Sequence, residues 1–120
     1  MIGRENGIEE RSFEFAGQIV RCCRHLRKNK EYDLARQLLR SGTAIGANVQ
    51  EAQAALTKRE FIAKMSIAAK EARETDYWLR LLSVQGILDS VPAREQLLTE
   101  IVAIQKILTS IIKTAQKNLK

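Results

Sequence analysis

The longest regular pattern of apolar positions lies in the middle of the chain. Apolar or small side chains recur there at steps of three and four residues: Phe61, Met65, Ala68, Ala72, Thr75, Leu79 and Leu82. This spacing predicts a helix with one seam against a partner helix. A second stripe contains two carboxylates at its centre: Ile67, Glu71, Glu74, Trp78 and Leu81. Because a surface helix places its acids opposite its apolar face, we expect this helix to have neighbours on more than one side.

The limits of this helix are indicated by local signals. Thr57 with Glu60 three residues later forms a T-x-x-E capping box, which is typical of a helix N-terminus. Gly86 indicates the C-terminus, since glycine commonly follows the last helical residue. The turn that follows is predicted at Asp89 to Val91.

Three further helices are predicted by the same spacing, over residues 8–28, 31–54 and 92–118. Asn6 with Glu9 resembles a cap for the first, and Pro92 suits the first turn of the last. Their seams are, in chain order, Ala16, Ile19, Cys23 and Leu26; Leu34, Leu38, Ser41, Ile45, Asn48 and Ala52; and Leu97, Ile101, Ile104, Leu108, Ile111 and Ala115.

The segment around Gly42 and Gly46 has two interpretations. Each glycine lowers helix stability by about 1 kcal/mol relative to alanine, so either could end the helix in a turn. The apolar periodicity nevertheless runs through both, which favours a continuous helix over residues 31–54. Two glycines four positions apart would then allow a neighbouring backbone to approach closely.

Four helices joined by short loops predict an all-α fold, an antiparallel up-down-up-down four-helix bundle. The 120 residues suit one domain, with residues 1–6 as a loose N-terminal end. If the chain reverses near residue 56, Ser41 lies level with Glu71, and Leu38 with Glu74. A buried carboxylate needs a partner, so we expect a structural polar network in the mid-bundle layer. Its predicted members are Glu71, Glu74 and Ser41, with Arg40 or Gln37.

Charge suggests an acidic partner. The net charge is +6 and the pI near 9.6, and nucleic acid is a usual partner of basic proteins. Five cations occur in a run without acids: Arg21, Arg24, Arg27, Lys28 and Lys30. The register places Lys106 level with Arg21, Arg40 and Arg73, as a mid-height belt. Such cations could neutralise phosphates without reading sequence, although a solvated polar face gives the same pattern.

Other functions find less support in the sequence. Only Tyr32 and Tyr77 are aromatic residues expected near the surface, so base stacking in single strands should be weak. His25 is the only histidine and no E-x-x-H motif occurs, so we expect no metal site, no cofactor and no catalysis. No apolar run approaches the roughly 20 residues of a membrane span, and the first residues have no signal-peptide core. The adjacent Cys22 and Cys23 fit a reducing compartment, which predicts a cytoplasmic protein.

Three segments resemble a known family. The stretches Arg40-Ser41-Gly42-Thr43-Ala44-Ile45-Gly46-Ala47-Asn48, Lys58-Arg59-Glu60-Phe61 and Lys70 to Leu82 are similar to those of the 23S rRNA-intervening-sequence (S23) four-helix-bundle proteins. The resemblance covers nearly the whole chain. Ala44 stands where the family typically has Ser in an S-I-G-A-N motif.

The resemblance implies a small bacterial bundle that forms rings, often pentamers. A related branch assists retroelement reverse transcriptases and binds nucleic acid through basic surfaces, while the activity of ordinary members is undefined. We therefore expect a homopentamer that binds the backbone of RNA or DNA. The alternative is a protein-interaction scaffold that uses the surplus apolar face of residues 92–118, which holds Leu98, Val102, Ile107 and Ile112.

Overall fold

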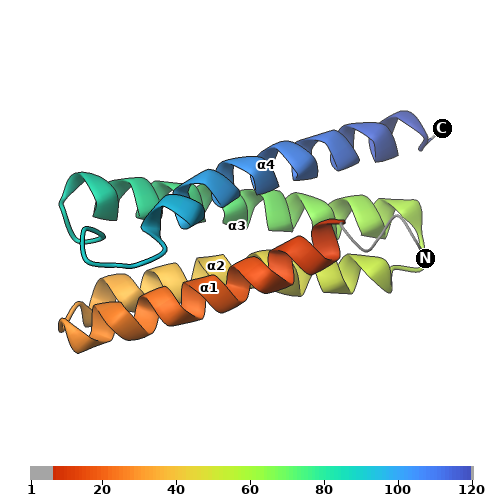
Figure 1. Cartoon of the computed structure of the whole chain (residues 1–120). Coiled ribbons are helices and arrows are strands. Elements are labelled where there is room, and N and C mark those ends of the chain that lie inside the picture. The colour runs from red at the N-terminus through yellow and green to blue at the C-terminus, as the bar shows by residue number, and fades with distance from the viewer. Residues whose placement is uncertain (1–6, 120) are drawn as a thin grey trace.

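The computed structural model describes residues 7–119 and forms four helices. They are α1 (Ile8–Lys28), α2 (Tyr32–Gln53), α3 (Lys58–Val84) and α4 (Arg94–Lys117). Each helix runs antiparallel to the one before it, which confirms the up-down-up-down bundle (Figure 1). The body is elongated, with extents of 49 × 26 × 21 Å.

The predicted limits of α3 are confirmed in atomic detail. The Thr57 side chain accepts a hydrogen bond from the Glu60 N–H at 3.0 Å. The Glu60 carboxylate accepts from the Leu56 N–H at 3.0 Å, one residue before the cap. At the other end Gly86 adopts φ +78°. The N–H groups of Gly86 and Ile87 donate to the carbonyls of Ser83 and Leu82, the double closure of a Schellman motif.

The start of the last helix and the cap of the first differ from the prediction, while α1 begins at Ile8 as predicted. α4 begins at Arg94, so Pro92 lies before the helix and Ala93 takes the N-cap position. The Val91 N–H donates to the Leu88 carbonyl at 2.9 Å, so the chain at Pro92 is still in a turn. Gly7 is the N-cap of α1 and makes no side-chain capping bond. The predicted cap Asn6 lies outside the described residues.

α2 is continuous from Tyr32 to Gln53, as the periodicity predicts, and neither glycine ends it. A Cβ atom on Gly42 would lie 2.9 Å from Cγ1 and Cγ2 of Ile19. One on Gly46 would lie 3.2 Å from the Ser12 carbonyl oxygen. The absence of side chains at these two positions therefore lets α1 pack directly on the α2 backbone.

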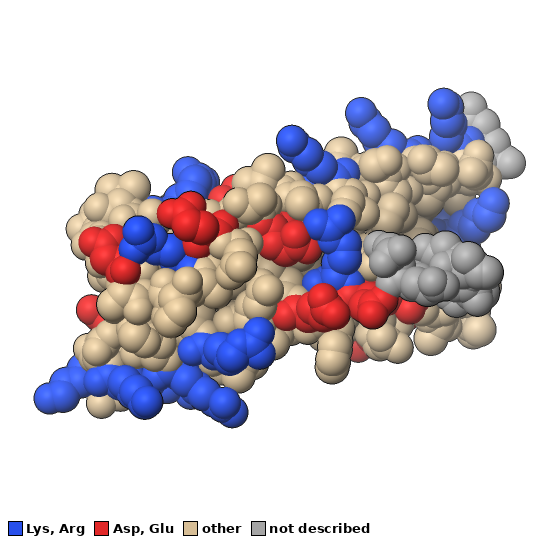
Figure 2. Space-filling model, in the orientation of Figure 1, with Lys and Arg blue, Asp and Glu red and all other residues tan. Residues whose placement is uncertain are grey.

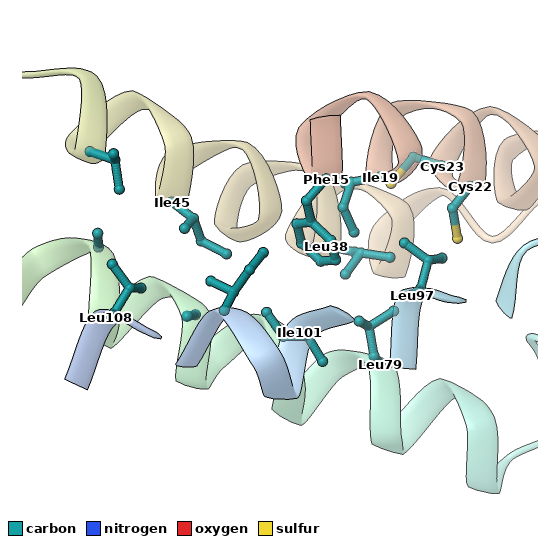
Figure 3. Packing of buried hydrophobic residues seen from close by; sticks show 14 of the residues in the cluster. Phe15, Ile19, Cys22, Cys23, Leu38, Ile45, Leu79, Leu97, Ile101 and Leu108 are labelled. Atoms are coloured by element: carbon teal, nitrogen blue, oxygen red, sulfur yellow. The ribbon is translucent and has the colours of Figure 1, made fainter. Parts of the chain in front are cut away.

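The core contains residues of all four helices (Figure 3). It follows the predicted seams, except that Ala16, Leu34, Asn48 and Phe61 are only half-buried. Phe15 and Ile19 of α1 meet Leu38 of α2, Leu79 of α3 and Ile101 of α4. On α4 full burial stops at Leu108. The predicted seam residues Ile111 and Ala115 are only half-buried.

The ends of α1 and α4 explain this incomplete burial. α1 begins at Ile8, which lines the same small cavity as Ile111. Past that point α4 continues along α3 without α1 beside it (Figure 1). Consecutive helices pack most extensively, and α1 and α4 touch least. The α1–α4 side of the bundle is consequently its open side.

Candidate nucleic-acid interface

Charge is divided along α1. The acids Glu9, Glu10 and Glu14 lie in its first half with Arg11, and all its other cations lie in its second half and in the following turn. We call these cations the α1 basic surface: Arg21, Arg24, Arg27, Lys28 and Lys30. All five side chains are exposed. Figure 2 shows Lys and Arg gathered at the end of the molecule where α1 ends.

The α1 basic surface is not neutralised within residues 7–119. Other cations form the ion pairs of that range: Arg11, Arg36, Arg40, Lys64, Arg80 and Arg94. The five cations of the α1 basic surface thus keep their charge available to an external anion.

Lys30 also has a role in the backbone. It adopts φ +66°, the left-handed region, which side chains other than glycine rarely enter. Its N–H donates to the Arg27 carbonyl and the Glu31 N–H donates to the Leu26 carbonyl, each at 2.9 Å. This Schellman closure ends α1 and turns the chain into α2.

A groove lies beside the α1 basic surface, between the second half of α1 and the start of α4. We call it the α1 groove; its volume is about 350 Å³. It is lined by Gln18, Arg21, Cys22, Arg24, His25, Lys28, Val91, Pro92, Ala93 and Leu97. His25 Nε2 lies 2.8 Å from Ser90 Oγ, which links the imidazole to the turn before α4.

The structure does not bring Lys106 to the α1 basic surface. Lys106 lines a separate open groove on α4 with Lys113. It lies about 13 Å along α4 from Leu97, which faces the α1 groove. Arg40, another member of the expected belt, is bound by carboxylates. The belt is therefore not formed, because Arg21 lies beside the start of α4 while Lys106 lines a different groove.

Arg40 instead holds two acids of α3. Its Nη1 lies 3.2 Å from Glu71 Oε1, its Nη2 bonds Glu74, and Trp78 Nε1–H donates to the same Glu74 oxygen at 3.0 Å. The bond from Arg40, and then that from Trp78, lowers the pKa of Glu74 below its ordinary value. The Glu74 bond likewise raises the pKa of Arg40.

This group lies at the margin of the α2–α3 interface rather than inside it. The side chains of Arg40, Glu71 and Glu74 are 49%, 18% and 36% exposed. Ser41, predicted to join them, bonds Thr75 instead, with 2.9 Å between Oγ and Oγ1 and no exposure of either residue. The facing residues are displaced by one turn from the predicted register, so hydroxyls rather than carboxylates occupy the core.

The reactive side chains of α1 are held in inert states. Burial raises the pKa of the Cys22 thiol to about 11. Burial, and then the neighbouring Cys22, raises that of Cys23 to about 12. Both thiols are thus protonated at neutral pH and are poor nucleophiles. Among residues 7–119 no three His, Cys, Asp or Glu side chains cluster as metal ligands would.

An ion pair between the first and the last helix was not predicted. The Arg11 guanidinium bonds Glu100 through two N–H groups, at 2.8 and 3.0 Å, and raises its own pKa by doing so. The pair bridges α1 and α4 beside a second groove that shares Gln18 with the α1 groove. The two helices are far apart in the chain, so no residue spacing indicates this contact.

Comparison with known proteins identifies relatives of this fold. The family model described as 23S rRNA-intervening sequence protein matches residues 4–110. A crystal structure of a protein of unknown function from the S23 ribosomal protein family of Bacteroides thetaiotaomicron VPI-5482 superposes with a TM-score of 0.83 at 42% identity. The match covers 88% of this chain and 98% of that one. No curated protein sequence matches. No helix in the described part of the chain has the length and apolar character to cross a membrane.

Proposed function

The chain belongs to the family of 23S rRNA-intervening sequence proteins, and from this premise we propose that it binds the phosphate backbone of RNA or DNA through the α1 basic surface. The observation that carries the proposal is the separation of charge. Six cations elsewhere on the helices meet acids, and the unpaired ones are spread along α3 and α4. Arg21, Arg24, Arg27, Lys28 and Lys30 also meet no acid among the described residues, and these five lie within ten consecutive residues. Cations near the end of α1 also suit the helix dipole, but that benefit is confined to the last turn and does not account for Arg21.

The expected binding is electrostatic. Each phosphate that is neutralised adds roughly 0.7 to 0.9 to the slope of log affinity against log salt concentration. Five cations on one subunit therefore give a slope of about 4, which is weak binding at physiological salt. Lys106 and Lys113 on α4 form a second, separate basic patch. Several copies of both patches would increase affinity by multivalency.

We propose that these copies are supplied by a homo-oligomer, the ring of five that the resemblance implies. The ring is supported by apolar side chains of α4 that the bundle does not fully bury. Val102 is 42% exposed, and Leu98, Ile107 and Ile112 are half-buried on a helix whose C-terminal turns lack α1. Repetition of one heterologous contact closes a ring when the rotation fits. Light scattering should give a mass of about 68 kDa, five times the 13.6 kDa of one chain. The mass of a monomer at micromolar protein concentration would contradict the ring.

A salt titration tests the binding. We expect a mixed-sequence RNA and a duplex DNA of equal length both to bind at low salt. The variant Arg24→Ala/Arg27→Ala/Lys28→Ala should lower the slope by roughly 2 to 3 without changing the oligomer mass.

The matched control removes the same charge at the other end of the bundle. Lys58, Arg59 and Lys117 are exposed and enter no ion pair within residues 7–119. Their triple alanine variant should leave the slope closer to that of the parent. An equal decrease of the slope in both variants would show that binding depends on net charge and not on the α1 basic surface.

The second candidate function is an interaction scaffold, favoured by the exposed Val102 and the half-buried side chains of the same α4 stripe. If neither nucleic acid binds at low salt, the α1 basic surface is a solvated face and the scaffold replaces the first proposal.

A further inference from the structure

We infer that the α1 groove binds one unstacked nucleotide, so that the protein prefers single-stranded nucleic acid to duplex. The inference rests on the proposed function, since the same cations would hold the backbone. The groove has about 350 Å³, close to the lower limit of ordinary ligand pockets. That size suits a single base and is too small for a helix or a duplex.

The lining of the groove combines two chemistries that a nucleotide also combines. Arg21, Arg24 and Lys28 provide cations on the α1 side. Pro92 provides an exposed apolar surface on the other side, with Val91 and Leu97 buried beneath it. Phosphate and sugar would lie on the cations while the apolar faces of the base lie on the far wall. In a duplex the bases are stacked inside and cannot use that wall.

His25 gives the groove a flat ring. Its Nε2 bonds Ser90 Oγ at 2.8 Å, so the imidazole is fixed by a residue of the facing turn. Histidine rings and arginine guanidinium planes both stack on unpaired bases. The sequence prediction of weak stacking considered only Tyr32 and Tyr77, neither of which lines the α1 groove.

Gln18 gives the groove an unused acceptor. Its Oε1 is shielded from solvent and accepts no hydrogen bond from the described residues. A shielded polar atom without a partner is unfavourable. Rotation of the Gln18 side chain into the α1 groove would let an exocyclic amino group of a base donate to Oε1, which would favour adenine, guanine or cytosine over uracil.

The test compares three labelled probes of sixteen phosphates by fluorescence anisotropy. They are an unstructured single strand, the same strand with abasic sites throughout, and a duplex. At one salt concentration the single strand should bind at least about 5-fold more tightly than the abasic strand, since stacking of one base is worth roughly 1 to 3 kcal/mol. The duplex should bind like the abasic strand.

Two variants keep every cation and change only the groove. His25→Ala removes the ring, and Ala93→Leu fills the space; Ala93 makes no side-chain cap bond that the change would break. Both should abolish the preference for the intact single strand and leave abasic binding unchanged. Ala47→Leu, on the exposed side of α2, is the control for added apolar volume and should keep the preference.

The outcomes separate this inference from the proposed function. Equal binding of the single strand and the abasic strand overturns the groove inference and leaves backbone binding intact. A parallel loss on both probes in Ala93→Leu also overturns it, because the cations rather than the base would then be affected. Failure of every probe at low salt removes the proposed function and this inference together.

Discussion

The hydroxyls of Ser41 and Thr75 meet at 2.9 Å in the centre of the α2–α3 interface, where neither residue is exposed. The Thr75 hydroxyl also lies 2.8 Å from the Glu71 carbonyl oxygen. A hydroxyl has one hydrogen. Thr75 therefore donates to that carbonyl and accepts from Ser41, which joins the two helices through one polar contact inside an apolar core.

Removal of the Thr75 hydroxyl alone should lower the free energy of unfolding more than removal of both hydroxyls. Thr75→Val leaves the buried Ser41 hydroxyl with only the Leu38 carbonyl at 3.5 Å, and should lower the free energy of unfolding by about 1 to 3 kcal/mol. Adding Ser41→Ala removes the remaining hydroxyl and should recover part of that loss. Urea denaturation of the two single variants and the double variant measures these changes. If the loss in the double variant equals the sum of the two single losses, the hydrogen bond between the two hydroxyls is contradicted.

Replacement by alanine should change the stability of the protein in opposite directions at Gly17 and Gly46. A Cβ at Gly17 meets only an Arg21 side-chain nitrogen, at 3.8 Å, so Gly17→Ala should stabilise the protein by up to about 1 kcal/mol. A Cβ at Gly46 would press on the Ser12 backbone, so Gly46→Ala should destabilise it by about 1 to 3 kcal/mol. Thermal melts of the two variants measure these effects. A higher melting temperature for Gly46→Ala would show that α1 and α2 are less closely packed at this position.

Lys30 offers a stabilising substitution. A residue with a side chain pays about 1 to 2 kcal/mol for the left-handed conformation, while glycine loses about 0.5 to 1 kcal/mol of chain entropy. Lys30→Gly should therefore raise the free energy of unfolding by about 0.5 to 1 kcal/mol. Lys30→Ala removes the same charge and keeps the strain, so its melting temperature should stay at or below that of the parent. Equal gains in both variants would assign the effect to charge.

Glu74 should contribute to acid sensitivity. Its pKa is lowered in the folded protein by Arg40 first and Trp78 second. A carboxyl with a lowered folded pKa stabilises the protein above its unfolded pKa, here near 4.5, and loses that contribution as pH falls through the folded pKa. The parent should exceed Glu74→Gln in stability at pH 7, by about 1 kcal/mol or less because the pair is partly exposed.

The difference between parent and Glu74→Gln should then shrink below pH 4.5. Denaturation at pH 7, 5 and 3, followed by the fluorescence of Trp78, the only tryptophan of the chain, measures it. A difference that is independent of pH would show that the loss in Glu74→Gln has another cause.

The helices were predictable because their signals are local. The cap at Thr57, the stop at Gly86 and the spacing from Met65 to Leu82 each depend on residues within a few turns. The start of α4 was placed too early because Pro92 suits a turn as well as a first helical turn. The positive φ of Lys30 was not predicted, since lysine has no preference for that conformation.

The contacts between helices were predictable only to within one turn. Loop lengths placed Ser41 near Glu71, but the packing of α2 on α3 sets it against Thr75 instead. A shift of one turn keeps the apolar seam aligned, so periodicity cannot detect it. The α1 groove and the Arg11–Glu100 pair were beyond reach, because they join the first and the last helix across the open side of the bundle.

The neighbour-to-neighbour packing of the helices bears on how fast the chain folds. α1 lies on α2, α2 on α3 and α3 on α4, across connections at residues 29–31, 54–57 and 85–93. Most native interfaces therefore form by closing short loops, and few depend on residues far apart in the chain. Proteins of such low contact order fold in microseconds to milliseconds. Each chain should thus bury its core in that time, without the need for a second copy.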